Sequence, residues 1–402
     1  MKLKYILISL GIVSLTSCNS MLDVKPYSFS SDNTYYSNEG QILRAVNGVY
    51  ASLQGLYTGD YWALTEMSSD NTNYQYDATD RGVQQREEID EFLITSTNNY
   101  VNNSWSTMYY VIQQTNVIVS RIDQVEFADE QVKNRYLGEV KFIRALQYFN
   151  LVRLFGGVPL HVTEVNSPET AFSNVKASVD EVYAQIIADA NDAISFLPDS
   201  FGGNDRGRVT KGAALTLLGE VYLTRKEYAQ AASTLEKVLP LGYSLVADYA
   251  DNFDPTKKNG SESIFEIQFD AGLQTENSNF IFTFGPRNAK TQLIGFPGNL
   301  GGSNIPTPSL YNAYEAGDNR RDKSIQLFDD PSNAGFPEAV AFGGKIPFAK
   351  KYYHPPFLED GRANENWPVY RYSYVLLMLA EAKNEIAAGD GEAHSLLTQV
   401  RT

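Results

Sequence analysis

Cysteine and histidine are the scarcest reactive residues in this chain of 402 residues. Cys18 is the single cysteine, so no disulfide can form within the chain. The three histidines, His161, His354 and His394, stand far apart and form no cluster with the ligand spacing of a zinc site. Phosphate-binding Gly-x-x-x-x-Gly-Lys, dinucleotide-binding Gly-x-Gly-x-x-Gly and nucleophile-elbow Gly-x-Ser-x-Gly patterns are missing as well. We therefore expect no metal, no cofactor and no catalytic residue.

Positive charge is also in short supply. The chain has 33 Lys and Arg against 48 Asp and Glu, a net charge of -15. Such a surface repels nucleic acid and anionic lipid, so neither is expected as an electrostatic partner. With so many carboxylates, the spacing of acid pairs carries no information about glycosidase chemistry. The run from Asp70 to Asp80 has oxygen ligands that suit calcium, but it lacks the EF-hand order, so we expect a solvated loop.

The N-terminus has the pattern of a secretory signal. Lys2 and Lys4 precede an apolar run, 5–15, which is shorter than the ~20 residues of a membrane span. Small residues then lead to Cys18 in Leu-Thr-Ser-Cys, which looks like a bacterial lipobox, the alternative being an ordinary signal followed by a stray cysteine. We expect residues 1–17 to be a signal peptide, Cys18 to be lipidated, and the polar stretch 18–39 to be a tether.

Helical patterns are clearest between residues 208 and 243. Ala214, Leu218, Val221 and Tyr222 share one helical face, and a second stripe follows after three polar residues, 225–227. So short a connection favours an antiparallel helical hairpin close to the tetratricopeptide pattern, which needs helical neighbours to bury its stripe. Further helices are expected at 42–53 with a stop at Gly55, and at 105–119, 136–155, 178–197, 370–388 and 391–402.

Two stretches lack a helical period. Residues 57–103 are predicted to be a long loop, and residues 244–369 a loop-rich insertion with many Gly, Pro and Asn. Inside the insertion, alternating apolar residues at 265–269 and 280–284 predict a small β-hairpin, and 295–314 a second binding loop. The predicted fold is mainly α, a single domain over 40–402 with tetratricopeptide-like helices at about 105–243 and 370–402.

Several segments together resemble the SusD/RagB family of surface lipoproteins of gut and oral Bacteroidetes, in the family's order. Family members continue beyond the Val400-Arg401 pair, and the last apolar stripe runs to the end of the chain, so we expect the sequence to be cut short. The segments are the lipobox Cys18; Ala45-Val-Asn-Gly-Val-Tyr50; Trp105 with Tyr109 to Asn116; Gly138 to Phe149 leading into Phe155-Gly-Gly-Val-Pro-Leu160; Asp180-Glu-Val-Tyr183; Gly207 to Ala214; Glu262-Ser-Ile-Phe265; Gly317-Asp-Asn-Arg-Arg321; and Tyr370 to Glu381.

The resemblance implies a lipoprotein anchored in the cell outer membrane and facing the exterior. Such a protein captures oligosaccharide and passes it to a SusC-type TonB-dependent transporter, without breaking bonds. We also expect the acidic helices to be mainly a partner surface. Three alternatives stay open: a peptide-binding protein like RagB, a lipid-anchored helical scaffold with no small ligand, and a hydrolase.

A sugar site needs flat apolar faces for the ring and planar amide, carboxylate or guanidinium groups for the hydroxyls, and the two loops supply both. Exposed loop aromatics also commonly just pack on their neighbours. Trp105, on a helical face, is expected in the core. The candidate ligand-binding residues are Asp70, Asn71, Tyr74, Tyr76, Arg81, Asn99, Tyr100, Phe296 and Asn299.

Four charged residues flank the most apolar helices: Glu139, Arg144, Arg371 and Glu381. A catalytic role is conceivable for charges in such places. Paired charges beside apolar helices more often fix helix packing, and this is the role we expect.

Overall fold

The computed structural model describes residues 35–76, 84–173, 175–273 and 275–401. The predicted signal peptide, Cys18, most of the predicted tether, and Arg81 lie outside the described residues. The helices are α3 (Glu39–Thr58), α4 (Tyr61–Glu66), α5 (Gln84–Asp90), α6 (Asn99–Arg121), α7 (Glu130–Phe155), α8 (Pro168–Ser173), α9 (Val179–Phe196), α10 (Lys211–Thr224), α11 (Tyr228–Leu235), α12 (Phe280–Phe284), α13 (Lys290–Ile294), α14 (Pro308–Ala313), α15 (Asn319–Ser324), α16 (Tyr372–Ile386) and α17 (Gly391–Arg401). The strands are β1 (Thr72–Asn73), β2 (Ser263–Ile267), β3 (Ile305–Pro306), β4 (Ile325–Asp329), β5 (Lys345–Ala349) and β6 (Trp367–Arg371).

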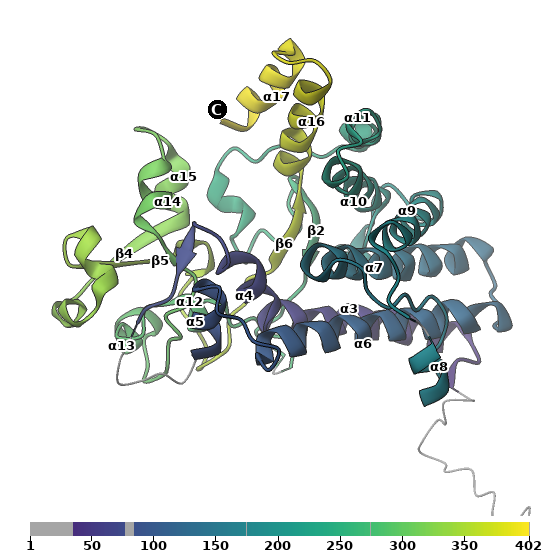
Figure 1. The fold of residues 1–402 in the computed structure, drawn as a ribbon, viewed down its shortest axis with the longest axis horizontal. Coiled ribbons are helices and arrows are strands. Elements are labelled where there is room, and N and C mark those ends of the chain that lie inside the picture. Colours follow the sequence, from purple (N-terminus) through teal and green to yellow (C-terminus); the bar gives the residue numbers. More distant parts are fainter. Residues whose placement is uncertain (1–34, 77–83, 174, 274, 402) are drawn as a thin grey trace, which may run out of the picture.

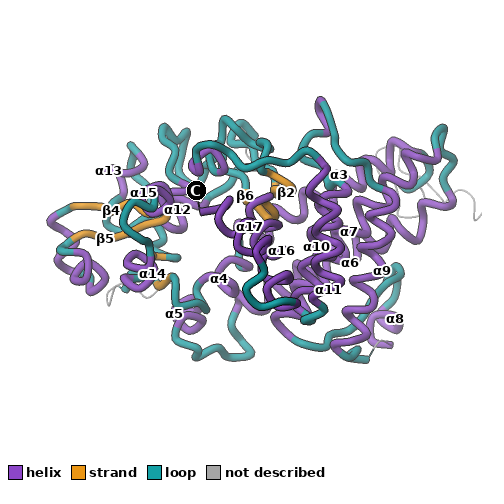
Figure 2. The backbone as a smooth tube through the Cα atoms, turned by 90° about the horizontal axis from the view of Figure 1, so that it is seen from above, coloured by secondary structure: helices purple, strands orange, loops and turns teal. Residues whose placement is uncertain are grey.

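The long helices form a stack, with α3 and α6 along the lower edge of Figure 1 and α16 and α17 at its top. Neighbours in the stack follow the order α6, α7, α9, α10, α11, α16, α17. Seen from above in Figure 2, helices fill one end of the molecule, while the other end holds loops, short helices and the strands β4 and β5. The mainly α fold with tetratricopeptide-like hairpins is therefore as predicted.

Local sequence signals explain where these helices begin and end. The Ser178 side chain accepts from the Glu181 backbone N–H while Glu181 accepts from Ser178, a capping box that starts α9. Helix α7 ends at Gly156, whose φ of 71° suits glycine. The predicted hairpin is α10 and α11, which approach so closely that a Cβ on Gly219 would lie 2.4 Å from the Leu235 side chain. The small residue is thus needed for this helix contact.

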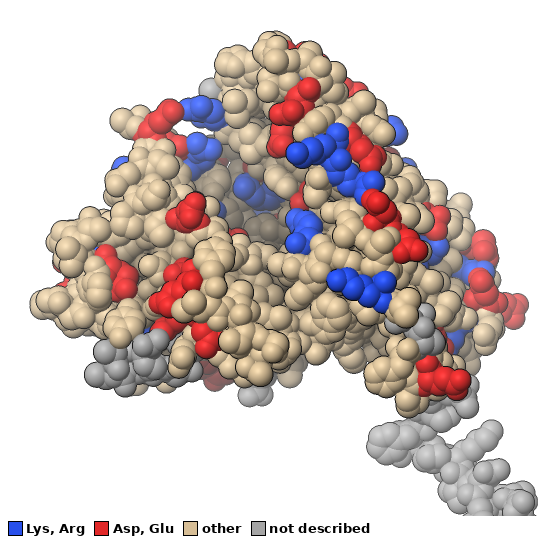
Figure 3. Space-filling view, in the orientation of Figure 1, with Lys and Arg blue, Asp and Glu red and all other residues tan. Residues whose placement is uncertain are grey.

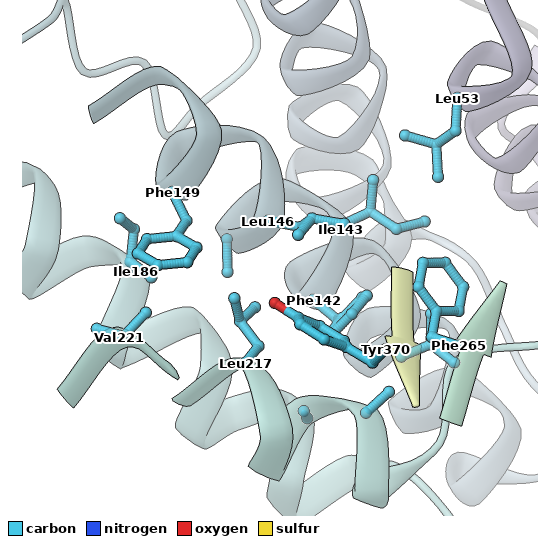
Figure 4. Close-up of a cluster of buried hydrophobic side chains, with 14 of the residues drawn as sticks. Leu53, Phe142, Ile143, Leu146, Phe149, Ile186, Leu217, Val221, Phe265 and Tyr370 are labelled. Atoms are coloured by element: carbon cyan, nitrogen blue, oxygen red, sulfur yellow. The ribbon is translucent and has the colours of Figure 1, made fainter. Parts of the chain in front are cut away.

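The main core lies where the helix stack meets the strands β2 and β6. Figure 4 shows Phe142, Leu146 and Phe149 of α7 pointing toward side chains of α9, α10 and the two strands. The rings of Phe142 and Phe265 meet edge to face with centroids 5.3 Å apart, and both are almost completely buried. Each such side chain stabilises the fold by about 1.5–3 kcal/mol.

The predicted β-hairpin in the insertion is wrong. Strand β2 forms as expected, but the alternating phenylalanines after it lie in helix α12, and β2 pairs antiparallel with β6, so that Glu266 faces Pro368. Ile281 is buried between Phe280 and Phe282, so this segment is apolar on all sides and has no exposed strand face. Strand β6 also takes Tyr370 and Arg371, so the predicted helix 370–388 begins only at Tyr372.

The stretch 57–103 is not a continuous loop. It contains α4, β1 and α5, and α6 begins at Asn99. Helix α3 runs through Gly55, the predicted stop, and ends at Thr58, before Gly59. The segment 295–314 likewise contains β3 and α14. Across the described ranges, none of the helices is both long and apolar enough to cross a membrane.

Candidate functional site

The two segments predicted to bind ligand come together through a short antiparallel pair of strands. Thr72 of β1 faces Pro306 of β3, and Asn73 faces Ile305. Thr307 extends the contact: its backbone N–H donates to the Asn71 carbonyl at 2.9 Å, and its hydroxyl donates to the Asp70 carbonyl at 2.8 Å. The backbone of Asp70 and Asn71 is therefore fixed while their side chains stay exposed.

We call the contact between residues 70–76 and residues 301–307 the β1–β3 joint. A buried glutamine adds hydrogen bonds to it. Gln75 is fully buried, and its backbone N–H donates to the Gly302 carbonyl at 2.6 Å. Its side-chain oxygen accepts from the Arg287 backbone N–H at 2.8 Å, and its side-chain nitrogen donates to Asn288 Oδ1 at 3.1 Å. Because both ends of the amide are satisfied by the segment after α12, Gln75 ties the first loop to the insertion.

Helix α5 adds a third connection. Its Arg86, only 5% exposed, donates through Nη1 to the hydroxyl of buried Ser303 and through Nη2 to the Gly301 carbonyl at 3.5 Å. Burial lowers the pKa of Arg86, and the nearby positive charge of Arg287 adds to this effect. Arg287 Nε donates to the same Gly301 carbonyl at 3.3 Å, so two guanidinium groups hold one turn of the insertion.

Tyr74 is half-buried and its hydroxyl is already engaged. It donates to Glu91 Oε1 at 2.5 Å, and burial together with this carboxylate raises the pKa of Tyr74 above its ordinary value. Asp90 lies beside it at the end of α5, where burial first and the charge of Glu91 second raise its pKa to about 6. What Tyr74 offers a ligand is therefore mainly the face of its ring.

Three other predicted residues surround this joint. The backbone N–H of Tyr76 donates to Glu338 Oε1 at 3.1 Å, and Glu338 belongs to a 3-10 turn, η7 (Pro337–Phe342). Asn99 is exposed at the start of α6, and its backbone N–H donates to Gln85 Oε1 at 2.8 Å. Tyr100 is half-buried, and burial raises its pKa.

Phe296 and Asn299 lie in a different part of the insertion. Phe296 is half-buried against a second apolar cluster that includes Ile294 and Leu300, whereas Tyr74 packs on the main core. Asn299 is exposed next to this cluster. The strand pair thus brings residues 70–76 to 301–307, and the structure gives Phe296 a packing role.

Three of the four charged residues beside the apolar helices, Glu139, Arg144 and Arg371, form ion pairs, as expected. Arg144 binds the Asp189 carboxylate with two hydrogen bonds, at 2.7 and 2.8 Å, and both residues are buried. Glu139 accepts from Arg208 at 2.9 Å. Arg371 donates to Glu262 at 2.9 Å. These pairs join separate helices and strands, while Glu381 is exposed on α16. Trp105 is half-buried against Tyr109 and Phe155, consistent with packing.

The sequence did not predict a hollow of about 1210 Å³ between the α14–α15 region and α16–α17, which Figure 3 shows as a recess in the surface. One signal for it was the Gly317–Arg321 motif, which forms part of its wall.

The wall of the hollow carries charged groups. Burial raises the pKa of Tyr249 in the wall, but the charges of Lys351 and Arg371 and a hydrogen bond from Ser324 outweigh this effect and lower the pKa. The four lining cations each pair with a lining acid: Arg320 with Asp318, Lys323 with Asp248, Arg371 with Glu262 and Arg401 with Glu315.

Two protein-family models match the sequence of this chain. A SusD-like family model described as starch-binding, associating with outer membrane, matches residues 20–223, just over half of the chain, and a second model, the SusD family, matches 345–402. The chain belongs to the SusD family. The matched ranges include β1, α5 and α16, whereas the insertion segment 301–307 lies between them.

Relatives within the SusD family align with different shares of the chain. SusD-like protein P2 of Formosa agariphila is 27% identical over 413 residues, 97% of this chain and 79% of the relative. The starch-binding protein SusD of Bacteroides thetaiotaomicron is 29% identical over 168 residues, 39% of this chain and 29% of that protein.

Solved structures of SusD-like proteins agree with the fold. A laminarin-binding SusD-like protein has a TM-score of 0.79 at 27% identity, covering 91% of this chain and 84% of that one. Surface glycan-binding protein A from Bacteroides thetaiotaomicron, in complex with laminarihexaose, has a TM-score of 0.75 at 20% identity, with coverages of 90% and 82%. At that identity the second likeness supports the fold alone.

Proposed function

We propose that this chain captures oligosaccharide at the outer membrane and passes it to a SusC-type TonB-dependent transporter. The observation that carries the proposal is the β1–β3 joint, which holds the exposed side chains of Asp70 and Asn71 and the ring of Tyr74 on one fixed support. Planar polar groups beside an aromatic face are what a pyranose ring requires. The laminarin binding of a SusD-like protein that is 27% identical supports glycan as the ligand class.

The proposal includes the location of the protein. A lipid on Cys18 would anchor the chain, because each buried methylene contributes about 0.8 kcal/mol and several acyl chains hold a protein firmly on a membrane. The family description, association with the outer membrane, supports this place. We further propose that the binding face points to the cell exterior and that the chain binds glycan without cleaving it.

Calorimetry on the ectodomain that starts at residue 19 tests the ligand. We expect saturable binding to laminarihexaose or to another oligosaccharide of a panel that includes maltoheptaose. The double change Tyr74→Ala, Tyr76→Ala should weaken that binding at least about tenfold, since an aromatic contact is worth about 1 kcal/mol. Tyr110→Ala, which removes a tyrosine 56% exposed on α6, should leave the affinity unchanged.

The other outcomes of the same experiment are distinct. Saturable binding of a peptide pool without glycan binding would replace the proposal by a peptide-binding function. A lack of binding to both would favour a helical scaffold. Release of shorter sugars during long incubation with a bound glycan would identify a hydrolase.

A further inference from the structure

The two most exposed large apolar side chains of the described residues lie close together in the sequence. Phe172 near the end of α8 is 88% exposed, and Val175 is 85% exposed. Val179, the first residue of α9, is 43% exposed. Apolar residues that are exposed singly need no explanation, but a group of them marks an interaction site. We call Phe172, Val175 and Val179 the α8 patch.

The backbone is attached to the helix stack on both sides of the α8 patch. Before α8, the side-chain Nε2 of Gln113 donates to the Val165 carbonyl at 2.9 Å, and its Oε1 accepts from the Val165 backbone N–H at 3.0 Å. After Val175, the Ala177 backbone N–H donates to the Val158 carbonyl at 3.0 Å. The patch therefore stays exposed although the segments beside it are held by the fold.

The α8 patch lies near the first described residues of the chain, 35 and 36. The Arg121 guanidinium lies over the Tyr36 ring, 5.0 Å from its centroid, and its Nε donates to Glu164 Oε2 at 2.8 Å. Glu164 precedes α8 by only one short stretch of chain, so Arg121 connects the start of the fold to the segment that carries the patch. In both Figure 1 and Figure 2, α8 lies at the opposite end of the molecule from β4 and β5.

The proposed lipid anchor cannot be far from this end of the molecule. The chain from Cys18 to Tyr35 spans at most about 60 Å, because an extended chain covers no more than about 3.6 Å per residue. The net charge of -15 gives no attraction to anionic lipid. Exposed phenylalanine and valine, in contrast, bind the boundary between headgroups and acyl chains without any charge.

We propose that the α8 patch inserts its side chains into the surface of a neutral lipid bilayer beside the anchor. This inference rests on the proposed lipid anchor and goes beyond it, because it assigns a second membrane contact to the folded part of the chain. Three side chains are too few for a stable protein interface, which buries about 800 Å² on each partner. The contact would keep the loop-rich end, with its candidate binding residues, at the far end of the molecule from the patch.

The test uses the lipidated protein, purified from membranes and placed in phosphatidylcholine vesicles with or without bromine on the acyl chains. Bromine quenches tryptophan fluorescence only at short range, and the emission of the unchanged chain is subtracted. We expect the tryptophan added by Phe172→Trp to lose about half of its fluorescence, since interfacial apolar side chains reach the start of the acyl chains. The tryptophan added by Val340→Trp should lose none, because Val340 is 80% exposed but lies beside β5 at the loop-rich end.

A second pair of changes tests whether the patch itself makes the contact. In the Phe172→Trp chain, Val175→Asp should reduce the quenching at least about twofold, because a carboxylate is costly to place in lipid. Val340→Asp in the same chain adds the same charge at a position of similar exposure and should leave the quenching unchanged.

Three results would overturn the inference. Absence of quenching at position 172 in a protein that stays bound to the vesicles would overturn it and leave the anchor in place. Absence of quenching in vesicles, together with shielding of position 172 from a water-soluble quencher in native membranes, would assign the patch to a protein contact such as the transporter. Failure of the purified chain to associate with vesicles would overturn the proposed anchor and this inference with it.

Discussion

At the scale of single residues, several side chains of the candidate site already form hydrogen bonds within the protein. The Tyr74 hydroxyl donates a hydrogen bond to Glu91, and the Arg86 guanidinium donates one to Ser303. The side-chain oxygen and nitrogen of Gln75 both form hydrogen bonds within the protein. What stays available is the exposed polar groups of Asp70, Asn71 and the aromatic faces. Recognition in this site would therefore depend on shape and ring faces more than on charge.

Asp90 should make the stability of the fold depend on pH. Its folded pKa of about 6 lies above the ordinary value of 3.8, so the folded chain holds the proton more tightly than the unfolded chain. This contribution is fully present below pH 3.8 and is lost as pH rises through about 6. Asp90→Asn should therefore unfold at higher urea than the unchanged chain at pH 8, and the difference should vanish near pH 4.

The exposed Asp70 offers a control for this measurement, because Asp70→Asn also removes one negative charge in the same region. A stabilisation at pH 8 that is equal in the two variants would show a general charge effect and contradict the role given to Asp90.

At the scale of elements, the site depends on how α5, β1 and β3 are joined. Each is short: β1 and β3 have 2 residues each and α5 has 7. Isolated elements of this length are unstable in water. The buried polar contacts of Gln75 and Arg86 therefore stabilise the joint together with the buried apolar side chains of Ile89 and Ile305.

Ser303→Ala tests this dependence with a minimal change of volume. It leaves the buried Arg86 guanidinium without its hydroxyl acceptor, which should lower the free energy of unfolding by about 1.5–3 kcal/mol. Glycan affinity should fall as well, because the first loop loses its support. Urea unfolding and calorimetry measure the two effects.

The control for Ser303→Ala is Ser233→Ala on α11, where an exposed serine hydroxyl donates only to the nearby Gln230 carbonyl at 3.1 Å. If both variants lose the same small amount of stability, the Arg86 contact does not support the joint.

The elements also show what the sequence could and could not predict. The hairpin α10–α11 and the capping box of α9 depend on residues a few positions apart, so their patterns are readable. The partner of β2 is β6, about a hundred residues along the chain, and Arg86 meets Ser303 across 217 residues. Helices α4 and α5 are too short for a helical period, and the alternating phenylalanines of α12 fit a strand equally well. The candidate residues of the first loop were predicted from composition, whereas the contacts that hold this loop, such as Arg86 with Ser303, join residues too far apart in the sequence to be predicted from it.

At the scale of the whole molecule, the helix stack and the loop-rich end differ in how they are built. The stack is held by apolar packing and by buried pairs such as Arg144 with Asp189, and it matches the family models through most of its length. The loop-rich end carries the exposed candidate residues. A helical support that carries its candidate binding residues on loops is an arrangement in which ligand choice can change without a change of fold.

Cys18→Ala should release the protein from membranes. Without the thiol no lipid can be attached, and the remaining chain has no described helix that would span a bilayer. Fractionation of cells into membrane and soluble parts measures the change. A variant that stays in the membrane fraction at the level of the unchanged chain would contradict lipid anchoring at this residue.

The long sequence distance across the β1–β3 joint also has a consequence for timing. Contacts between residues as far apart as Arg86 and Ser303 close a large loop of chain at a cost in entropy, so we expect them to form late in folding. A nascent or damaged chain that has folded its helices but not this joint would have no assembled binding face. Under the proposed function, glycan binding would then require that both ends of the molecule have folded. Only completely folded copies would pass oligosaccharide to the transporter.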